Sequence, residues 1–382
     1  MKIWVIGRSY PIKQNKMRGT FELEQAQLLE RGGNQVSYIA AIFHPVNKVK
    51  KWGYCTFEDE NVKVYLNSVF FAPERMHIHL PKFQGWVWKR LLKKVEKERG
   101  VPDIIHIHYP GMVSIPEIVL GFQKRGTKIV ITDHWSQTLN DSMDKFQRKQ
   151  LIEYVNKADK ILCVSEPLKN SIKKISKTTK EINIVPNMVS SKFSFIDSCS
   201  KDSEYNFIVV GRLAPVKRIE QIVYAFSKAF ANNNNVKLII VGEGNERKKI
   251  ERIVKAKNIE KRVTMTGTLS REKVAELINR ADALVCYSKW ETFGVPVIEA
   301  WACGKPVVVS NAVGCIENWS EELGYVVSRD NIEELTNAMW QIYQNRKFYS
   351  GKNISMFAKS NFGEQAVYQK LMDIYLSMQI SL

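Results

Sequence analysis

Two carboxylates eight positions apart stand out in residues 288–310, SKWETFGVPVIEAWACGKPVVVS. Glu291 lies in a loop after an apolar run, and Glu299 lies in the first turn of a helix that is expected to begin near Pro296. The free amides and partial positive charge of such a helix start bind phosphate, and Gly294 leaves room for a phosphate to reach the backbone. Carboxylates suit sugar hydroxyls, which donate hydrogen bonds to them. The segment therefore predicts a site for a ligand that carries both phosphate and sugar.

Two basic residues follow the first expected strand of the C-terminal half. Arg212 comes directly after Gly211, and Lys217 lies five positions further on. Fixed cations at such a position can stabilise negative charge on a bound ligand. The sequence contains no D-x-D metal motif, and the pair His106 and His108 lacks a third ligand at a recognisable spacing. We therefore expect no metal site and no cofactor.

The elements that must position these residues follow from the hydrophobic pattern. Short apolar strands alternate with helices in residues 1–190, and again from residue 205 onward, after a serine-rich stretch at 190–204. This alternation is typical of parallel sheets covered on both faces. We predict an α/β fold with two Rossmann-like, doubly wound domains, residues 1–190 and 191–362, and a ligand site in the cleft between them.

Composition narrows the class of protein. The chain has 382 residues, of which 45% are hydrophobic, 10% aromatic and 25% charged, so it is globular rather than disordered. No apolar stretch approaches the ~20 residues of a membrane span, and there is no signal-peptide core at the N-terminus. The six cysteines are scattered without a C-x-x-C pair, which argues against a disulfide framework or a zinc knuckle. We expect a cytoplasmic protein with reduced thiols.

The net charge of +18 is unevenly distributed, because residues 1–190 hold 31 basic and 18 acidic side chains, a net charge of +13. Residues 82–99 alone carry +5. Four apolar residues of this stretch fall on one helical face, and lysines and arginines spread around the other: Trp88, Leu91, Leu92 and Val95. This pattern fits an interfacial helix on an anionic membrane, and it equally fits a surface helix that packs its apolar face on its own domain.

The segment from Glu291 to Glu299 resembles the E-x7-E signature of retaining glycosyltransferase family 4 enzymes, which have the two-domain GT-B fold. Further similar motifs in the C-terminal half are Val210-Gly211-Arg212-Leu213 followed by Lys217, the turn Val241-Gly242-Glu243-Gly244, Thr266-Gly267 and Ala281-Asp282. The N-terminal half is similar more loosely, through Gly19, the stretch Phe21 to Val36, the strand Asp103 to His108 and Ile131-Thr132-Asp133-His134.

This resemblance implies a GT-B enzyme that moves a sugar, with retention of configuration, from a nucleotide sugar bound by the C-terminal domain to an acceptor bound by the N-terminal domain. A UDP-sugar is favoured, and a helix at 363–382 is expected to pack back on the N-terminal domain. The implied catalytic residues are His134, Arg212, Lys217 and Glu291. The implied donor-binding residues are Gly19, Gly211, Gly242, Gly244, Thr292, Phe293, Gly294, Val295 and Glu299.

The resemblance also gives these residues roles. Arg212 and Lys217 match the basic pair on the donor diphosphate, and Glu299 matches the residue that holds the ribose hydroxyls. Glu291 matches a residue near the donor sugar and its phosphate, and His134 matches a histidine near the reacting carbon. The expected acceptor is a lipid-linked saccharide in the synthesis of bacterial surface polysaccharide such as capsule or O-antigen, at the inner face of the cytoplasmic membrane.

Two alternatives remain at this point. A sugar-nucleotide epimerase would share the fold and the donor site. The basic excess would also suit a nucleic-acid-binding protein, but the sequence has no helix-turn-helix, zinc-finger or RNP-type signature, so we expect no nucleic-acid partner.

Overall fold

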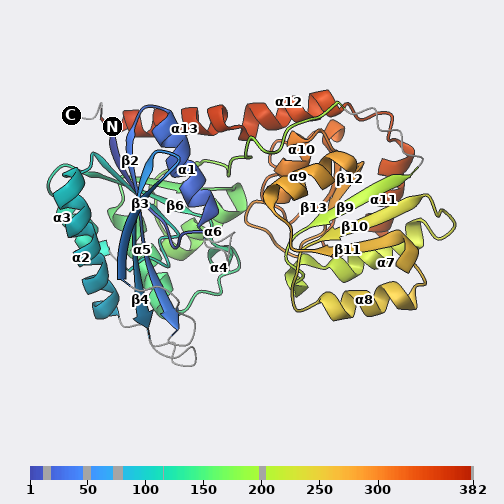
Figure 1. Ribbon diagram of the computed structural model, residues 1–382, viewed down its shortest axis with the longest axis horizontal. Coiled ribbons are helices and arrows are strands. Elements are labelled where there is room, and N and C mark those ends of the chain that lie inside the picture. Colours follow the sequence, from blue (N-terminus) through green and yellow to red (C-terminus); the bar gives the residue numbers. More distant parts are fainter. Residues whose placement is uncertain (12–18, 46–52, 72–80, 115, 198–203, 380–382) are drawn as a thin grey trace. The chain divides into compact units, whose positions relative to one another are not determined.

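The computed structural model describes residues 1–11, 19–45, 53–71, 81–114, 116–197 and 204–379. The chain divides into two compact units, each built around its own sheet (Figure 1). Unit 1 comprises Met1–Val185 and Tyr368–Leu382, and unit 2 comprises Pro186–Val367. The division therefore falls a few residues before the boundary at 190 that the sequence suggested. Residues just after it pack into unit 2, where the Val189 amide donates to the Phe362 carbonyl at 2.8 Å.

Unit 1 contains an eight-stranded sheet with the order β3-β4-β2-β1-β5-β6-β7-β8. Its strands are β1 Lys2–Ile6, β2 Gln35–Pro45, β3 Gly53–Asp59, β4 Val62–Phe71, β5 Ile104–His108, β6 Lys128–Asp133, β7 Lys160–Cys163 and β8 Ile182–Ile184. All neighbours are parallel except β3, which pairs antiparallel with β4 at one edge. Every residue of β5 is buried, as expected for a central strand with both faces covered.

Helices cover this sheet, and in Figure 1 it is seen between α2 and α3 on one side and α1 and α6 on the other. The helices are α1 Thr20–Arg31, α2 Pro81–Arg99, α3 Pro116–Gln123, α4 Ser136–Leu139, α5 Lys145–Lys157, α6 Glu166–Ser176 and α13 Glu364–Ser377. The division between the units falls inside α13, whose later part belongs to unit 1. There the Tyr375 hydroxyl lies 2.7 Å from Nδ1 of His106 on β5.

Unit 2 contains a six-stranded parallel sheet with the order β11-β10-β9-β12-β13-β14. Its strands are β9 Tyr205–Val210, β10 Val236–Val241, β11 Val263–Gly267, β12 Ala283–Cys286, β13 Val307–Ser310 and β14 Gly324–Val327. Its helices are α7 Ile219–Ala229, α8 Arg247–Ala256, α9 Arg271–Arg280, α10 Val295–Ala302, α11 Ile332–Gln344 and α12 Gly351–Phe362. Strands β12 and β13 are buried throughout.

The predicted α/β fold with two Rossmann-like domains is confirmed, and local chemistry explains where several helices begin. Helix α5 starts with a capping box in which Asp144 accepts from the amide of Gln147 and the Gln147 side chain accepts from the Asp144 amide. Helix α9 starts after Ser270, whose hydroxyl accepts from the Lys273 amide. The antiparallel pair β3 and β4 was not anticipated, because a hairpin at the edge interrupts the alternation of strand and helix.

Candidate functional site

The strands of unit 2 are parallel, so the residues that follow them gather at one edge of the sheet, the carboxyl edge. The turn after β9 holds Gly211 and Arg212, and the turn after β10 holds Gly242 and Gly244. These turns bind each other, because the Leu213 amide donates to the Glu243 carbonyl at 2.9 Å. A Cβ atom on Gly242 would lie 1.9 Å from the Gly211 carbonyl oxygen, so only glycine allows this close approach. The backbones of these two turns therefore pack directly against each other at this edge, and the Arg212 side chain beside them is exposed.

Lys217 and Glu291 form an ion pair at this edge. Lys217 ends the short 3₁₀ helix Pro215–Lys217, and Glu291 follows β12. Burial alone would lower the pKa of Lys217, but the facing carboxylate of Glu291 outweighs it, so the pKa is raised and the lysine is held as a cation. Ser288 donates from its hydroxyl to Oε2 of Glu291 at 3.2 Å. The positive charge of Arg212 acts to lower the pKa of Lys217, which indicates that the two predicted cations lie near each other.

Helix α10 begins at the predicted position, directly after Gly294. Gly294 has φ 100°, and a Cβ atom there would lie 2.3 Å from a methyl carbon of Val313. The loop before it runs through Thr292 and Phe293, and the Phe293 ring is buried against Phe362. The side chain of Phe293 therefore fixes the loop to the core. A helix start at the end of a parallel strand presents backbone amides to an anion.

Glu299 is buried on α10 and is paired with a residue that the sequence did not indicate. Its Oε1 lies 3.0 Å from Nη2 of Arg271, the first residue of α9, and the side chains are 8% and 16% exposed. The expected place of Glu299 in the first turn is wrong, because α10 begins at Val295 and Glu299 lies in its second turn. Arg271 is the first residue of the helix that follows the turn at Gly267, so its side chain lies at the same edge as α10.

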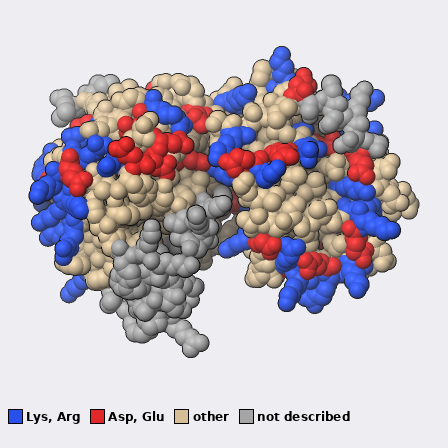
Figure 2. All heavy atoms as spheres, viewed as in Figure 1, with Lys and Arg blue, Asp and Glu red and all other residues tan. Residues whose placement is uncertain are grey.

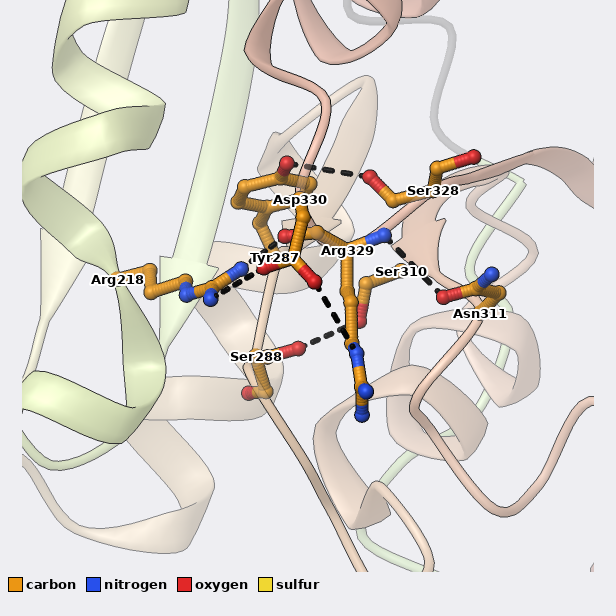
Figure 3. A network of polar contacts seen from close by, with 8 residues as sticks. All are labelled: Arg218, Tyr287, Ser288, Ser310, Asn311, Ser328, Arg329 and Asp330. Carbon is orange, nitrogen blue, oxygen red and sulfur yellow. Dashed lines mark hydrogen bonds and ion pairs between the residues drawn. The ribbon is translucent and has the colours of Figure 1, made fainter.

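A second polar network at the same edge holds the loop that carries Lys217 (Figure 3). Arg218 follows Lys217 with the left-handed φ of 50° and caps α7. Its guanidinium donates to the Arg329 carbonyl and to Oδ1 of Asp330, the latter at 2.7 Å. Tyr287 donates to the Ser328 carbonyl at 3.1 Å, and Ser310 donates to the Ser288 carbonyl at 2.7 Å. These bonds join the loops after β9, β12 and β14 to one another and to the last residue of β13.

In unit 1, His134 follows β6 at the carboxyl edge of the sheet. It contacts His108, a histidine to which the sequence analysis gave no catalytic role. Its Nε2 lies 2.9 Å from Nδ1 of His108, the last residue of the adjacent strand β5. The His108 ring stacks on His106 with centroids 4.4 Å apart, and His134 stacks on Tyr109 at 5.1 Å. The two histidines come together because β5 and β6 pair with His108 opposite Thr132, which places the two strand ends side by side.

Charged groups surround this stack of rings. The guanidinium of Arg8, which follows β1, lies 3.8 Å from the centroid of the Tyr109 ring. Nε of Arg8 lies 3.2 Å from Oε1 of Glu22, a carboxylate buried on α1. Gly19, with φ 89°, directly precedes α1 in the same unit. Burial raises the pKa of Asp133 to about 6, against hydrogen bonds from Thr138 and from the Trp135 amide.

The apolar face of residues 82–99 is not available to a membrane. Trp88, Leu91, Leu92 and Val95 are at most 2% exposed, because α2 packs that face against β2 and β4. The expectation that these side chains enter the headgroup layer is therefore wrong. The other face of α2 is exposed and basic, and Figure 2 shows Lys and Arg gathered along the border of unit 1 where α2 lies in Figure 1. Trp86 is 52% exposed beside this face.

A hollow of about 1050 Å³ lies between α2, α3 and α5, and its lining includes Lys82, Trp86, Lys93 and Lys149.

In the described part of the chain, no three His, Cys, Asp or Glu side chains are grouped so that they could hold a metal ion. None of the described helices has both the length and the apolar character that crossing a bilayer requires.

Two family models match the chain and divide it near the unit boundary. Residues 23–193 match Glycosyltransferase Family 4, and residues 192–355 match Glycosyl transferases group 1. The chain is a glycosyltransferase. The two matches together run through both carboxyl edges described above, and they support the resemblance to family 4 that the E-x7-E segment suggested.

Curated relatives are similar at low identity. This glycosyltransferase is 26% identical over 363 residues to N-acetyl-alpha-D-glucosaminyl L-malate synthase of Bacillus anthracis, covering 91% of this chain and 89% of that protein. It is 24% identical over 244 residues to the phosphatidylinositol N-acetylglucosaminyltransferase GPI3 subunit of Saccharomyces cerevisiae. That match covers 62% of this chain and spans only 54% of the yeast protein.

Solved structures confirm the GT-B fold. Sucrose-phosphate synthase from Thermosynechococcus elongatus has a TM-score of 0.77 at 20% identity, covering 100% of this chain and 99% of that one. Anabaena HepE in complex with UDP and glucose has a TM-score of 0.71 at 15% identity, covering 99% and 100%.

Proposed function

We propose that this glycosyltransferase uses a nucleotide-sugar donor and binds its diphosphate at the carboxyl edge of unit 2. The observation that carries the proposal is the Lys217–Glu291 pair beside the start of α10, with Arg212 close by and Glu299 one turn further along the helix. We propose that Lys217 and Arg212 bind the diphosphate together with the free backbone amides at the start of α10. Glu299 is then the candidate ligand of the ribose hydroxyls.

The ion pair also suggests how the site responds to its donor. Lys217 is held as a cation by Glu291. When a diphosphate arrives, it competes for Lys217 and leaves the Glu291 carboxylate to accept a hydrogen bond from a sugar hydroxyl. As the nucleoside diphosphate departs it gains negative charge, which Lys217 and Arg212 stabilise without a metal. We further propose that the transferred sugar keeps its anomeric configuration and that His134 contacts the donor sugar.

A uridine nucleotide is the favoured donor, and N-acetylglucosamine is the first sugar to test. The HepE complex contains UDP and glucose, and the two curated relatives are named for N-acetylglucosaminyl transfer. A panel of sugar nucleotides should be tested for release of nucleoside diphosphate and for thermal stabilisation. A specific donor at 100 times its dissociation constant should add about 2.7 kcal/mol to the free energy of unfolding. If no sugar nucleotide stabilised the protein, the donor proposal would fail.

For the acceptor we propose a lipid-linked saccharide of bacterial surface polysaccharide, reached by a protein bound peripherally at the inner face of the cytoplasmic membrane. The basic face of α2 supports this, as does the phosphatidylinositol named in the yeast relative. The malate named in the Bacillus anthracis relative favours a second candidate, a small soluble hydroxy acid. Transfer of labelled sugar to lipid extract and to L-malate in parallel separates the two.

The membrane contact is tested by charge reversal on α2. Lys93→Glu with Lys94→Glu should lower partitioning onto anionic liposomes by about 30-fold or more, since each lysine near such a surface contributes about 1 kcal/mol. The matched control is Lys173→Glu with Lys174→Glu on α6, which makes the same charge change at exposed positions of the same unit. Equal loss in both variants would mean that net charge, and not α2, governs binding.

The alternative activity, epimerisation of a sugar nucleotide, predicts a different product. An epimerase would convert the donor sugar with no acceptor present and without net loss of nucleotide sugar. Proton NMR of the donor during incubation without acceptor distinguishes this outcome from transfer.

A further inference from the structure

Three histidine rings form a continuous stack at the carboxyl edge of unit 1. His106 binds Tyr375 through Nδ1 at 2.7 Å and Thr132 through Nε2 at 2.6 Å, so both of its ring nitrogens have partners. His108 binds His134 through Nδ1, whereas its Nε2 is buried without a hydrogen-bond partner among the described residues. His106 and His108 are fully buried, while His134 is only partly buried. The stack therefore leads from the core of unit 1 to its carboxyl edge.

Only one hydrogen fits between Nδ1 of His108 and Nε2 of His134, which are 2.9 Å apart. His108 is neutral, because burial lowers its pKa well below the ordinary range and the neighbouring His106 lowers it further. A neutral imidazole has one N–H and one lone pair. If the hydrogen of His108 were on Nε2, a buried N–H would have no acceptor, and orphaned N–H groups are the rarer kind in proteins. The lone pair therefore belongs on Nε2 and the hydrogen on Nδ1, where it is donated to His134.

We propose that His108 is a positioning residue that holds His134 as a neutral imidazole with its own hydrogen on Nδ1. This inference rests on the proposed function, in which His134 contacts the donor sugar. To gain a proton, His134 would need His108 to move its hydrogen to the unpartnered Nε2. The other charged and titratable groups around the pair are Arg8, Glu22, His106, Tyr109 and Asp133.

A neutral His134 suits the chemistry of glycosyl transfer. The reacting sugar acquires positive charge in an oxocarbenium-like transition state. An imidazolium beside it would oppose that charge, whereas a neutral ring can donate one N–H to a sugar oxygen at no electrostatic cost. Enzymes elsewhere keep an imidazole neutral for a similar reason, by lowering its pKa through its surroundings.

The test is nitrogen-15 NMR of the full-length protein with labelled histidines, recorded from pH 5 to pH 8. The signals of His134 are assigned by their absence from the spectrum of His134→Gln. We expect wild-type His134 to remain neutral with its hydrogen on Nδ1 over this range. In His108→Leu it should take up a proton near the ordinary pKa of about 6.5. An Nε2–H tautomer in the wild type, or the same titration in wild type and His108→Leu, would overturn the proposal.

Kinetics separate positioning from mere structural support. His108→Leu should lower kcat by about 10-fold or more, with a further loss below pH 6.5, and leave the donor KM within about twofold. His108→Asn offers an amide donor in place of Nδ1 and should restore most of kcat. Tyr375→Phe, which removes only the partner of His106, is the control. Unchanged kcat in a folded His108→Leu would also overturn the role.

The NMR result stands whether or not the donor proposal holds. If the protein transfers no sugar but His134 shows the expected tautomer, the proposed function fails and the geometry survives. If His108→Leu does not fold, the wild-type tautomer together with His108→Asn still decides the matter.

Discussion

At the carboxyl edge of the unit 2 sheet, charged side chains meet in opposite pairs, whereas at the same edge of the unit 1 sheet histidine rings stack on one another. Lys217 with Glu291 and Arg271 with Glu299 exemplify the first edge. His106, His108 and His134 exemplify the second. The sequence repeats the contrast, because all six histidines lie in residues 44–134 and none lies in unit 2.

The difference shows that one fold can supply two electrostatic environments. Paired charges can be redistributed when a charged ligand arrives, so the unit 2 edge suits a diphosphate. Burial lowers the pKa of His106 and His108, so these two rings add no positive charge at the unit 1 edge, where Arg8 is paired with Glu22.

Lys217→Ala should have the largest effect, a fall in kcat of about 100- to 1000-fold, as expected for loss of a charge contact made in the transition state. Steady-state kinetics with a saturating donor measure it. The control is Lys289→Ala, an exposed lysine on the neighbouring loop, which should keep wild-type kcat. A Lys217→Ala enzyme with normal turnover would remove the diphosphate role from this edge.

Mild acid should destabilise unit 1 more than unit 2. Burial lowers the pKa of His106 to about 3 and that of His108 well below its ordinary value, so the unfolded chain binds more protons below pH 6.5. The stability from these neutral rings is complete above pH 6.5 and is lost as the pH falls toward 3. The raised pKa of Asp133 acts in the opposite direction between about 4 and 6. The net loss from pH 7 to pH 5 should be about 2 to 4 kcal/mol.

Hydrogen exchange at pH 7 and pH 5 localises this loss. Amides of β5 and β6 should lose protection, while amides of β9 and β12 should keep theirs. Equal loss in the two units would contradict the contrast between their edges.

Glu299→Ala should weaken donor binding by about 10- to 100-fold, the cost of hydrogen bonds to a charged group, and change kcat at saturation much less. Isothermal titration with the nucleoside diphosphate measures it. Since the change also leaves Arg271 without its buried partner, Glu299→Gln serves as the milder variant. Glu276→Ala on the exposed part of α9 is the control. Unaltered affinity in both Glu299 variants would reject the ribose role.

Arg218 gives the smallest effect. Arg218→Ala should destabilise unit 2 by about 1 to 2 kcal/mol, through loss of its contacts with Arg329 and Asp330. Arg218→Gly should be about 1 kcal/mol more stable than Arg218→Ala, because glycine adopts the left-handed φ of 50° without strain. Urea unfolding compares them. The reverse order would show that backbone strain at this position is unimportant.

Periodicity and turn residues predicted the two-sheet architecture and the start of α10, because buried parallel strands and Gly-Val-Pro helix starts leave local traces in a sequence. The pairings of Glu299 with Arg271 and of His134 with His108 join residues 28 and 26 positions apart, and no local pattern encodes them. The sequence also could not show what the apolar face of α2 packs against. The same amphipathic spacing serves a membrane or a sheet, and only the three-dimensional packing on β2 and β4 decides between them.

The hydrogen bond between Tyr375 and His106 has a consequence for biosynthesis. A ribosome that has made residues 1–185 has produced every strand of the first sheet but not the tyrosine that completes its interior. Unit 2 is translated whole before that tyrosine emerges. The nascent first sheet must therefore wait, with a polar ring in its core lacking this partner, until nearly two hundred further residues have been added.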